Sequence, residues 1–210
     1  MNRGRLITIE GIDGAGKTTL AAGLIDALRA RGIDVRPLRE PGGVPTAERI
    51  REVVIDPELH VSARTEALLY AAARAQLVEE AIEPLLDRGT WLVLDRFIDS
   101  SLAYQGGGRQ LGIDAVRAIN EFAIRNARPD RTLLLMIDPA LGRGRSQSRT
   151  RELDRLEREQ DDFFERTVAA YEQLRSHDPH RIRQINAARP PEQVLRAALN
   201  ELADLLPDPS

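Results

Sequence analysis

The sequence predicts an α/β domain with a parallel β-sheet, and two observations lead to this fold class. Short segments with the pattern of β-strands alternate with longer segments of helical periodicity along the 210 residues. Two strand segments, residues 91–94 and 132–137, are almost wholly apolar, as expected where helices cover both faces of a sheet. Strands joined through helices pair in parallel, so βαβ units are predicted around one sheet.

In the first half of the chain, the predicted order is strand, helix, strand, helix, helix and strand, over residues 5–10, 18–31, 34–38, 46–55, 62–86 and 91–94. The first strand is β-branched and leads into a Gly-rich turn, and the first helix has leucines at helical spacing and ends at Gly32. The second strand leads into a loop that begins at Glu40. Ser62 is the expected N-cap of the longest helix.

In the second half, the predicted order is helix, strand, helix, strand and helix, over residues 114–126, 132–137, 153–176, 181–185 and 190–206. Pro190 suits the start of the last helix, where a missing N–H group costs nothing. Residues 143–151 hold four Arg among Ser, Gln, Thr and Gly without an apolar stripe, so no core-facing element is expected there. No repeat or linker is visible, and a single domain over residues 1–210 is predicted.

Composition excludes several classes of protein and site. The chain has 30 Lys and Arg against 33 Asp and Glu, and a net charge of −3 argues against nucleic acid or anionic membrane as a partner. The absence of Cys excludes disulfides, thiolate metal sites and a Cys nucleophile. No apolar run reaches the length of a membrane span and the N-terminus has no signal-peptide core, so a cytoplasmic protein is expected.

A phosphate-binding loop is the strongest motif. The segment GIDGAGKT, residues 11–18, matches G-x-x-x-x-G-K-[ST] directly after a predicted strand and before a predicted helix. Its glycines let successive N–H groups point at phosphate oxygens, and the following helix adds the positive end of its dipole. The residues expected to bind ATP are Gly11, Ile12, Asp13, Gly14, Ala15, Gly16, Lys17, Thr18 and Thr19.

Lys17 is the only Lys among the 30 basic residues. A compact ammonium fits beneath the β- and γ-phosphates, whereas a planar, forked guanidinium does not, which explains why this position keeps Lys in a chain that otherwise uses Arg. Guanine recognition usually relies on an Asn-Lys-x-Asp segment, and a chain with one Lys cannot have it, so ATP is the expected nucleotide. In open parallel sheets, ligands bind outside the C-terminal ends of the strands, where the loops at Gly11, Glu40 and Asp95 are predicted to meet.

Five segments between residues 6 and 199 resemble bacterial thymidylate (dTMP) kinases: EGIDGAGKTT (10–19), REPGG (39–43), YAAARAQ (70–76), DRFIDSSLAYQGGGR (95–109) and an Arg-rich stretch followed by ELDRLE (152–157). The first motif is common to many nucleotide-binding proteins, whereas REPGG and AYQGGGR are more particular. The resemblance implies a P-loop NTPase fold with a five-stranded parallel sheet and an Arg-rich lid. It also implies transfer of the ATP γ-phosphoryl group to dTMP, giving dTDP, with Mg²⁺, in a homodimer.

The resemblance also implies an acceptor site, with dTMP bound by Asp13, Arg51, Tyr70, Arg74, Arg96, Ser101, Tyr104 and Gln105. Arg96 is expected to grip the acceptor phosphate, and Asp95 to lie near the Mg²⁺ that Thr18 binds. Tyr70, where the family usually has Phe, would stack on thymine, and Arg74 would hydrogen-bond the base. Tyr104 would crowd the ribose 2′ position.

Structural roles remain the alternative for these residues: a turn residue for Asp13, a solvated helix residue for Arg51, a core aromatic for Tyr70, a surface residue for Arg74 and an ion pair for Asp95 with Arg96. The sequence departs from the family at Phe97, where Tyr is frequent. His60, His177 and His180 match nothing, and the last two are expected in a solvated turn. The segment 186–187 resembles a loop that borders adenine, and the sequence leaves open whether the bond before Pro41 is cis.

The phosphate-binding loop contains no Arg, although some family members place a catalytic Arg there. The cation that the transition state needs is therefore expected from a lid over about residues 142–153. Arg149 is the first choice, with Arg145 and Arg151 behind it because this stretch looks one residue longer than usual. A solvated basic helix turn is the alternative for these arginines and for Arg143.

Two other functions remain open. A deoxynucleoside kinase shares the loop and the lid but accepts an uncharged 5′-hydroxyl, and the two acceptor-side arginines, Arg74 and Arg96, argue for a charged acceptor. A switch ATPase whose hydrolysis drives partner assembly would have no acceptor pocket, and REPGG and AYQGGGR would then need another explanation.

Overall fold

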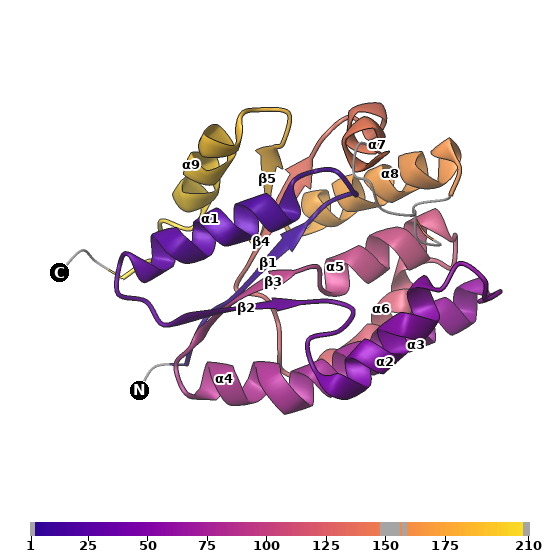
Figure 1. Ribbon diagram of the computed structural model, residues 1–210, viewed down its shortest axis with the longest axis horizontal. Helices are drawn as coiled ribbons and strands as arrows, with labels where there is room; N and C mark the ends of the chain where they lie inside the picture. Colours follow the sequence, from indigo (N-terminus) through magenta and orange to yellow (C-terminus); the bar gives the residue numbers. More distant parts are fainter. Residues whose placement is uncertain (1–2, 148–155, 157–158, 208–210) are drawn as a thin grey trace.

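The structure is a computed structural model that describes residues 3–147, 156 and 159–207. In this part, five strands form one parallel sheet in the order β2-β3-β1-β4-β5 (Figure 1). The strands are β1 (Leu6–Glu10), β2 (Val35–Arg39), β3 (Trp91–Asp95), β4 (Arg131–Met136) and β5 (Ile182–Asn186). All five coincide with predicted strands to within two residues at either end, and the predicted fold class is confirmed.

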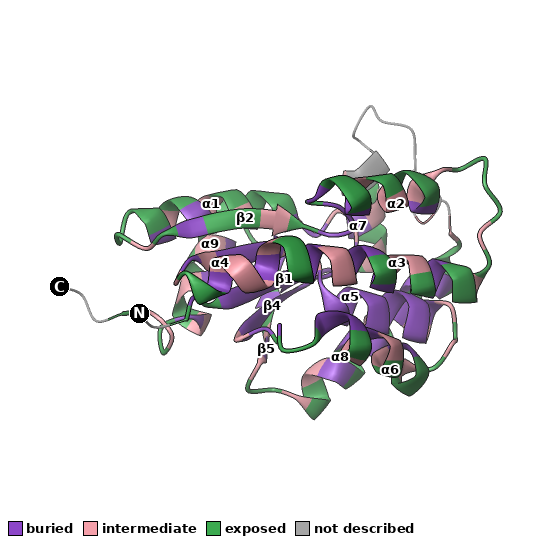
Figure 2. Ribbon diagram, turned by 90° about the horizontal axis from the view of Figure 1, so that it is seen from below, coloured by how far each residue is buried: buried purple, intermediate pink, exposed green. Residues whose placement is uncertain are grey.

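Helices cover both faces of the sheet. One face is covered by α1 (Lys17–Arg29) and α9 (Pro191–Glu201), whose leucines pack on Ile7 and Ile9 of β1. The opposite face is covered by the remaining large helices: α3 (Ala63–Leu77), α4 (Glu83–Asp87), α6 (Ile113–Ile124) and α8 (Asp161–His177). Helix α2 (Pro45–Ile55) packs against α3 and adds Ala47 to the same buried core (Figure 2).

The long helix predicted over residues 62–86 is present as α3, the π-helical turn η1 (Val78–Ile82) and α4. Its predicted N-cap is confirmed, because the Ser62 hydroxyl accepts a hydrogen bond from the Thr65 N–H at 3.4 Å. The predicted helix over residues 153–176 is observed from Asp161 to His177; residues 153–155 and 157–158 lie outside the described part, and residues 159–160 are not helical.

The prediction missed the helical segment made of α5 (Ile98–Ser101) and η2 (Leu102–Gly108). Its Ser and Gly residues are poor helix formers, so helix formation here depends on tertiary packing. A Cβ at Gly107 would lie 2.4 Å from the Ala170 Cβ, and one at Gly108 would lie 2.6 Å from the Phe163 ring. The glycines therefore let this segment approach α8 closely.

The start of the Arg-rich stretch is helical, whereas the sequence-based prediction had a basic helix turn only as the alternative to a lid. Helix α7 spans Pro139–Gln147. The Asp138 carboxylate accepts hydrogen bonds from the N–H groups of Ala140 at 2.8 Å and Leu141 at 3.3 Å, which satisfies donors at the helix start. The sequence of this helix has no apolar stripe that would reveal it.

Candidate active site

The loops that follow β1, β2 and β3 meet at one edge of the sheet and enclose a cavity of about 250 Å³. Its walls include most of the residues predicted to bind the two nucleotides: Asp13, Gly14, Lys17, Thr18, Arg51, Tyr70, Arg74, Asp95, Arg96, Ser101, Tyr104 and Gln105. Glu40 and Pro41 from the loop after β2 complete it, and the Glu40–Pro41 bond is cis. Donor-side and acceptor-side candidates therefore share one cavity.

The phosphate-binding loop has the backbone that its glycines predict. Gly14 has a φ of 78° and Gly16 a φ of 91°, a region that favours glycine, and Gly16 is the N-cap of α1. Lys17 turns back into the loop, where its Nζ donates to the Gly11 carbonyl at 3.1 Å and the Ile12 carbonyl at 3.0 Å. The buried side chains of Ile12 and Ala15 hold the loop to the core, whereas Thr19 is exposed and does not line the cavity.

Burial lowers the pKa of Lys17 to about 8, and the neighbouring Arg96 cation acts in the same direction, against Asp13 and Asp95. Burial raises the pKa of Asp13, but the Arg96 and Lys17 cations outweigh it and hold that carboxyl well below its usual range. Asp13 is therefore a permanent anion between two cations, at 2.5 Å from Arg96 Nη2 and 3.6 Å from Lys17 Nζ.

Thr18 and Asp95 form the candidate metal site. The Thr18 hydroxyl donates to Asp95 Oδ2 at 3.1 Å, so the first turn of α1 and the end of β3 place a hydroxyl and a carboxylate together on the cavity wall. Oxygen ligands of this kind suit Mg²⁺, which typically binds through one or two protein oxygens, nucleotide phosphates and water.

Arg96 is held in an unusual backbone conformation directly after β3. Its φ of 69° is rare for a residue with a side chain and turns the guanidinium toward the phosphate-binding loop. There it donates to Asp13, to the Gly11 carbonyl at 3.0 Å and to the Ser100 hydroxyl at 3.0 Å, and it lies over the Tyr104 ring. The Asp95–Arg96 pair of the structural alternative is not formed, because Arg96 pairs with Asp13.

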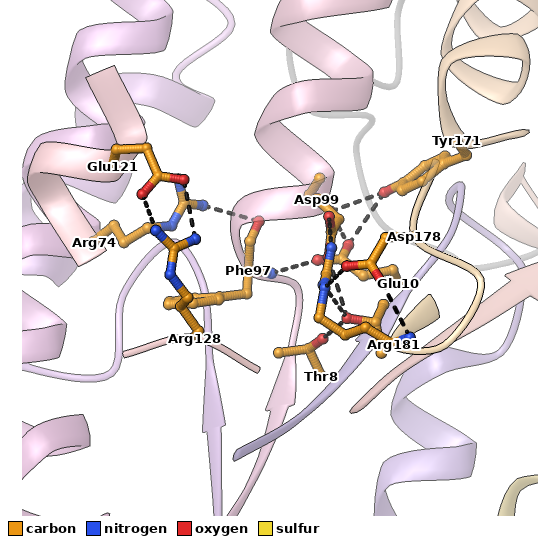
Figure 3. A network of polar contacts seen from close by, with 12 residues as sticks. Thr8, Glu10, Arg74, Phe97, Asp99, Glu121, Arg128, Tyr171, Asp178 and Arg181 are labelled. Atoms are coloured by element: carbon orange, nitrogen blue, oxygen red, sulfur yellow. Dashed lines mark hydrogen bonds and ion pairs between the residues drawn. The ribbon is translucent and has the colours of Figure 1, made fainter. Parts of the chain in front are cut away.

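Arg74 is a buried residue with 1% exposure, so the expectation of a surface residue is wrong. All five of its N–H donors are used. Nε and Nη2 both donate to Glu40 Oε2, Nη2 also to the Phe97 carbonyl (Figure 3), and Nη1 to Ser101 and Asn120. A base that bonds to Arg74 must therefore replace one of these partners, and of these the Ser101 hydroxyl and Glu40 line the cavity.

The other predicted acceptor residues also line the cavity. Tyr70 is only half-buried, so a core aromatic is not what the structure shows. Arg51 is half-buried and donates to the Pro41 carbonyl at 3.1 Å, which disagrees with a freely solvated side chain. Gln105 donates from Nε2 to the fully buried Glu66 at 2.8 Å, so its amide carbonyl is the end with no partner among the described residues.

Helix α7 packs directly on the phosphate-binding loop. A Cβ at Gly14 would lie 2.0 Å from the Gly142 carbonyl, so two glycines allow this backbone contact. Arg145 donates to the Ala187 carbonyl at 3.0 Å, in the segment expected to border adenine, and Arg143 pairs with Asp161 at 2.9 Å. Arg149 and Arg151 lie outside the described residues, so the structure does not test which Arg is catalytic.

Three groups at the site had no role in the sequence-based prediction. Glu40 and Ser100 line the cavity, and Glu10 lies just behind the phosphate-binding loop with no exposed surface. Glu10 and Glu40 belong to the motifs EGIDGAGKTT and REPGG, so their membership in a motif was the available signal. The three His residues are exposed and lie away from the cavity, and His177 and His180 flank a turn as expected.

Comparisons with known proteins place the chain in a family. The family model described as thymidylate kinase matches residues 9–198. Proteins named thymidylate kinase are similar over almost their full length: one from Bordetella pertussis is 48% identical over 94% of this chain and 93% of its own. The relative from Halorhodospira halophila is 45% identical (98% and 96% covered), and that from Lactobacillus delbrueckii subsp. bulgaricus is 43% identical (98% and 99%). The chain belongs to the thymidylate kinase family.

Proposed function

We propose that the chain transfers the γ-phosphoryl group of ATP to dTMP, with Lys17 on the donor phosphates and Arg96 on the acceptor phosphate. The observation that supports these roles is the meeting of both cations at Asp13, 3.6 Å from Lys17 and 2.5 Å from Arg96. Phosphoryl transfer needs two anionic substrates held in line with their charge neutralised, and cations on both sides of one cavity serve that purpose.

Binding and orientation are divided between the two walls. The N–H groups of residues 11–18 and the N-terminus of α1 would hold the ATP phosphates. Arg96, Arg51 and Asp13 would surround the acceptor phosphate, and Tyr70, Arg74, Ser101 and Gln105 the base. Tyr104 contacts Arg96 and lines the cavity, and its ring would crowd a ribose 2′-hydroxyl.

Mg²⁺ is the proposed cofactor. The Thr18 hydroxyl would bind the ion, and the Asp95 carboxylate would lie near it. Their 3.1 Å contact shows that hydroxyl and carboxylate oxygens are available side by side. When bound, the ion neutralises charge on the transferring phosphate oxygens. Arg149 of the lid is proposed to supply the further cation of the transition state, with Arg145 and Arg151 as the other candidates.

A homodimer is proposed through the layer formed by α2, α3 and α6. Large apolar side chains are exposed on each of these helices: Val53 (42%) on α2, Leu68 (55%) on α3 and Phe122 (88%) on α6. Helix α3 packs against both neighbours, so the three helices form one continuous surface (Figure 2). Apolar groups this exposed are typical of an association surface. Sedimentation of the wild type and of Phe122→Arg tests this: a dimer that persists unchanged in the variant contradicts the proposed surface.

One coupled assay tests the activity against its alternatives. ADP production is measured with ATP and dTMP, with ATP and thymidine, and with ATP alone. Turnover only with dTMP supports the proposal. Turnover with thymidine would indicate a deoxynucleoside kinase, and equal turnover without acceptor would indicate a switch ATPase. Among the helices that the structure describes, none is long and apolar enough to cross a membrane.

A further inference from the structure

Glu10 is a fully buried carboxylate that the proposed reaction does not use. It is the last residue of β1 and directly precedes Gly11 of the phosphate-binding loop. Alternation along the strand directs Ile7 and Ile9 toward α1 and directs Glu10 to the opposite face, where α5 and α8 lie. A buried carboxylate is costly unless hydrogen bonds compensate for its lost hydration, so its partners indicate what it does.

Three donors converge on the Glu10 carboxylate, and two of the residues that supply them, Phe97 and Tyr171, are labelled in Figure 3. The Phe97 N–H donates to Oε1 at 2.8 Å, and Oε2 accepts from the Ser100 hydroxyl at 2.5 Å and from the Tyr171 hydroxyl at 3.2 Å. Phe97 lies between β3 and α5, Ser100 lies in α5, and Tyr171 belongs to α8. Glu10 therefore ties the start of the phosphate-binding loop to the segment that carries Arg96.

Both contacts with that segment bear on Arg96. Phe97 follows Arg96 in the chain, so the bond to its N–H holds the backbone next to the residue with the rare φ of 69°. Ser100 accepts from Arg96 Nη1 at 3.0 Å while it donates to Glu10, so the hydroxyl connects the guanidinium to the carboxylate. One contact acts on the Arg96 backbone and the other on its side chain.

We propose that Glu10 is a positioning residue of the transfer reaction: through Phe97 and Ser100 its carboxylate holds Arg96 in the conformation that receives the acceptor phosphate. The inference rests on the role of Arg96 under the proposed function. An ionised Glu10 accepts all three hydrogen bonds, whereas a protonated one must donate with one oxygen and gives up an acceptor position. Arg96 is therefore held best when Glu10 is charged.

The ionisation of Glu10 is adjustable near neutral pH. Burial raises the pKa of Glu10 to about 7, and the nearby Asp99 carboxylate also raises it. The Ser100 hydrogen bond and the Arg96 cation lower this pKa, but they do not outweigh the rise. The other titratable groups that face it are Lys17 from α1 and Tyr171 from α8. Because the pKa is raised on folding, the contribution of Glu10 to stability is complete below its unfolded value and is lost as the pH rises through about 7. Activity that needs the charged form rises over the same interval.

The test compares Glu10→Gln, Arg96→Ala and the double variant, with Tyr171→Phe as the matched control. Gln is a neutral isostere, so Glu10→Gln keeps the volume and removes the charge. At pH 8 we expect it to lower kcat/KM for dTMP at least roughly tenfold, as expected for a misaligned phosphate contact, with KM for ATP within about twofold of wild type. Tyr171→Phe removes the contacts of this hydroxyl with Glu10 and Ser100, but it keeps the hydrogen bonds of Glu10 to Phe97 and Ser100 and that of Arg96 to Ser100, so its kinetics should stay near wild type.

The pH profile separates positioning from a structural role. The acceptor phosphate titrates near pH 6 in every variant, so the ratio of wild-type to Glu10→Gln kcat/KM isolates Glu10. With a pKa of about 7, that ratio should rise roughly tenfold between pH 6 and pH 8. In the Arg96→Ala background, Glu10→Gln should add no further loss, because the residue it positions is gone.

Two results would overturn the inference. One is a Glu10→Gln enzyme whose kcat/KM for dTMP at pH 8 equals that of the wild type. The other is a Glu10→Gln substitution that lowers kcat/KM as much in the Arg96→Ala background as in the wild type. An Arg96→Ala enzyme with a normal KM for dTMP would instead overturn the proposed role of Arg96, so the two failures are distinguishable. Should Glu10→Gln not fold, as judged by ATP binding in titration calorimetry, Ser100→Ala removes the hydroxyl that joins Arg96 to Glu10, together with its contact to Tyr171, and keeps the bond between the Phe97 N–H and Glu10. Its loss in kcat/KM must then disappear in the Arg96→Ala background.

Discussion

The donor and acceptor walls of the cavity are built in different ways. On the donor wall, Lys17 contacts carbonyls only five and six residues away in the phosphate-binding loop. On the acceptor wall, Arg74 contacts side chains or carbonyls from three separate segments, at Glu40, at Phe97 and Ser101, and at Asn120. The donor wall is local in sequence, whereas the acceptor wall exists only once the chain has folded.

The difference separates function from stability. Lys17 is a cation whose burial costs hydration, and its removal leaves Asp13 paired with Arg96. Arg74 is the common partner of groups buried in the core, so its removal would leave several of them without a hydrogen bond. We therefore expect donor-wall substitutions to change turnover alone, and acceptor-wall substitutions to change both binding and stability.

The largest expected effect is a loss of stability in Arg74→Ala. The change leaves the buried Glu40 carboxylate without its ion-pair partner. Burial already raises the pKa of Glu40, and the Arg74 cation that opposes this rise would be lost. Breaking one partner out of a buried ion pair typically costs about 3–5 kcal/mol. Urea unfolding measures this, with Arg128→Ala as the control: its pair with Glu121 is exposed, and an effect within about 1 kcal/mol is expected. Equal midpoints for both variants would contradict the comparison.

The next effect is loss of turnover in Lys17→Ala without loss of stability. The variant lacks the cation that stabilises negative charge on the transferred phosphate in the transition state. This stabilisation is worth on the order of 3 kcal/mol or more, so kcat should fall by more than about 100-fold. The unfolding midpoint should stay near wild type. Lys17→Arg should fail nearly as badly in the kinase assay because the fork does not fit beneath the phosphates. Near-normal turnover of Lys17→Arg would overturn the explanation for the lone Lys.

The same division describes what the sequence could predict. The phosphate-binding loop, its glycine conformations and the five strands follow from local patterns of a few residues. The Arg74 network does not, because Asn120 lies 46 residues away and Phe97 contributes a backbone carbonyl. Helix α7 was not predicted as an element because it lacks an apolar stripe. The α5–η2 segment was not predicted because packing against α8 overrides the low helix propensity of its Ser and Gly residues.

A smaller effect is expected from the lid, where single Ala substitutions at Arg143, Arg145, Arg149 and Arg151 locate the catalytic Arg. One position, Arg149 as the first choice, should lose roughly 100-fold in kcat with little change in ATP affinity, as for a cation that acts in the transition state. Arg145 already donates to the Ala187 carbonyl, so Arg145→Ala should weaken ATP binding instead. Near-normal kcat in all four variants would exclude a lid Arg.

The smallest effect separates base stacking from packing at Tyr70. Its ring is half-buried on the cavity wall, so it is available to a base, and it lies one helical turn before Arg74 on α3. Tyr70→Ala should weaken dTMP binding by about 1–3 kcal/mol, the range of base–aromatic stacking, while Tyr70→Phe keeps the ring and should bind dTMP within about threefold of wild type. Because the ring is not part of the core, the unfolding midpoint of Tyr70→Ala should move far less than that of Arg74→Ala.

Titration calorimetry with dTMP and urea unfolding of both Tyr70 variants give the result. If Tyr70→Ala binds dTMP as tightly as the wild type, the stacking role is wrong. If it instead unfolds as readily as Arg74→Ala, then the half-buried ring carries stability as well, and the acceptor wall is structural even where it faces the ligand.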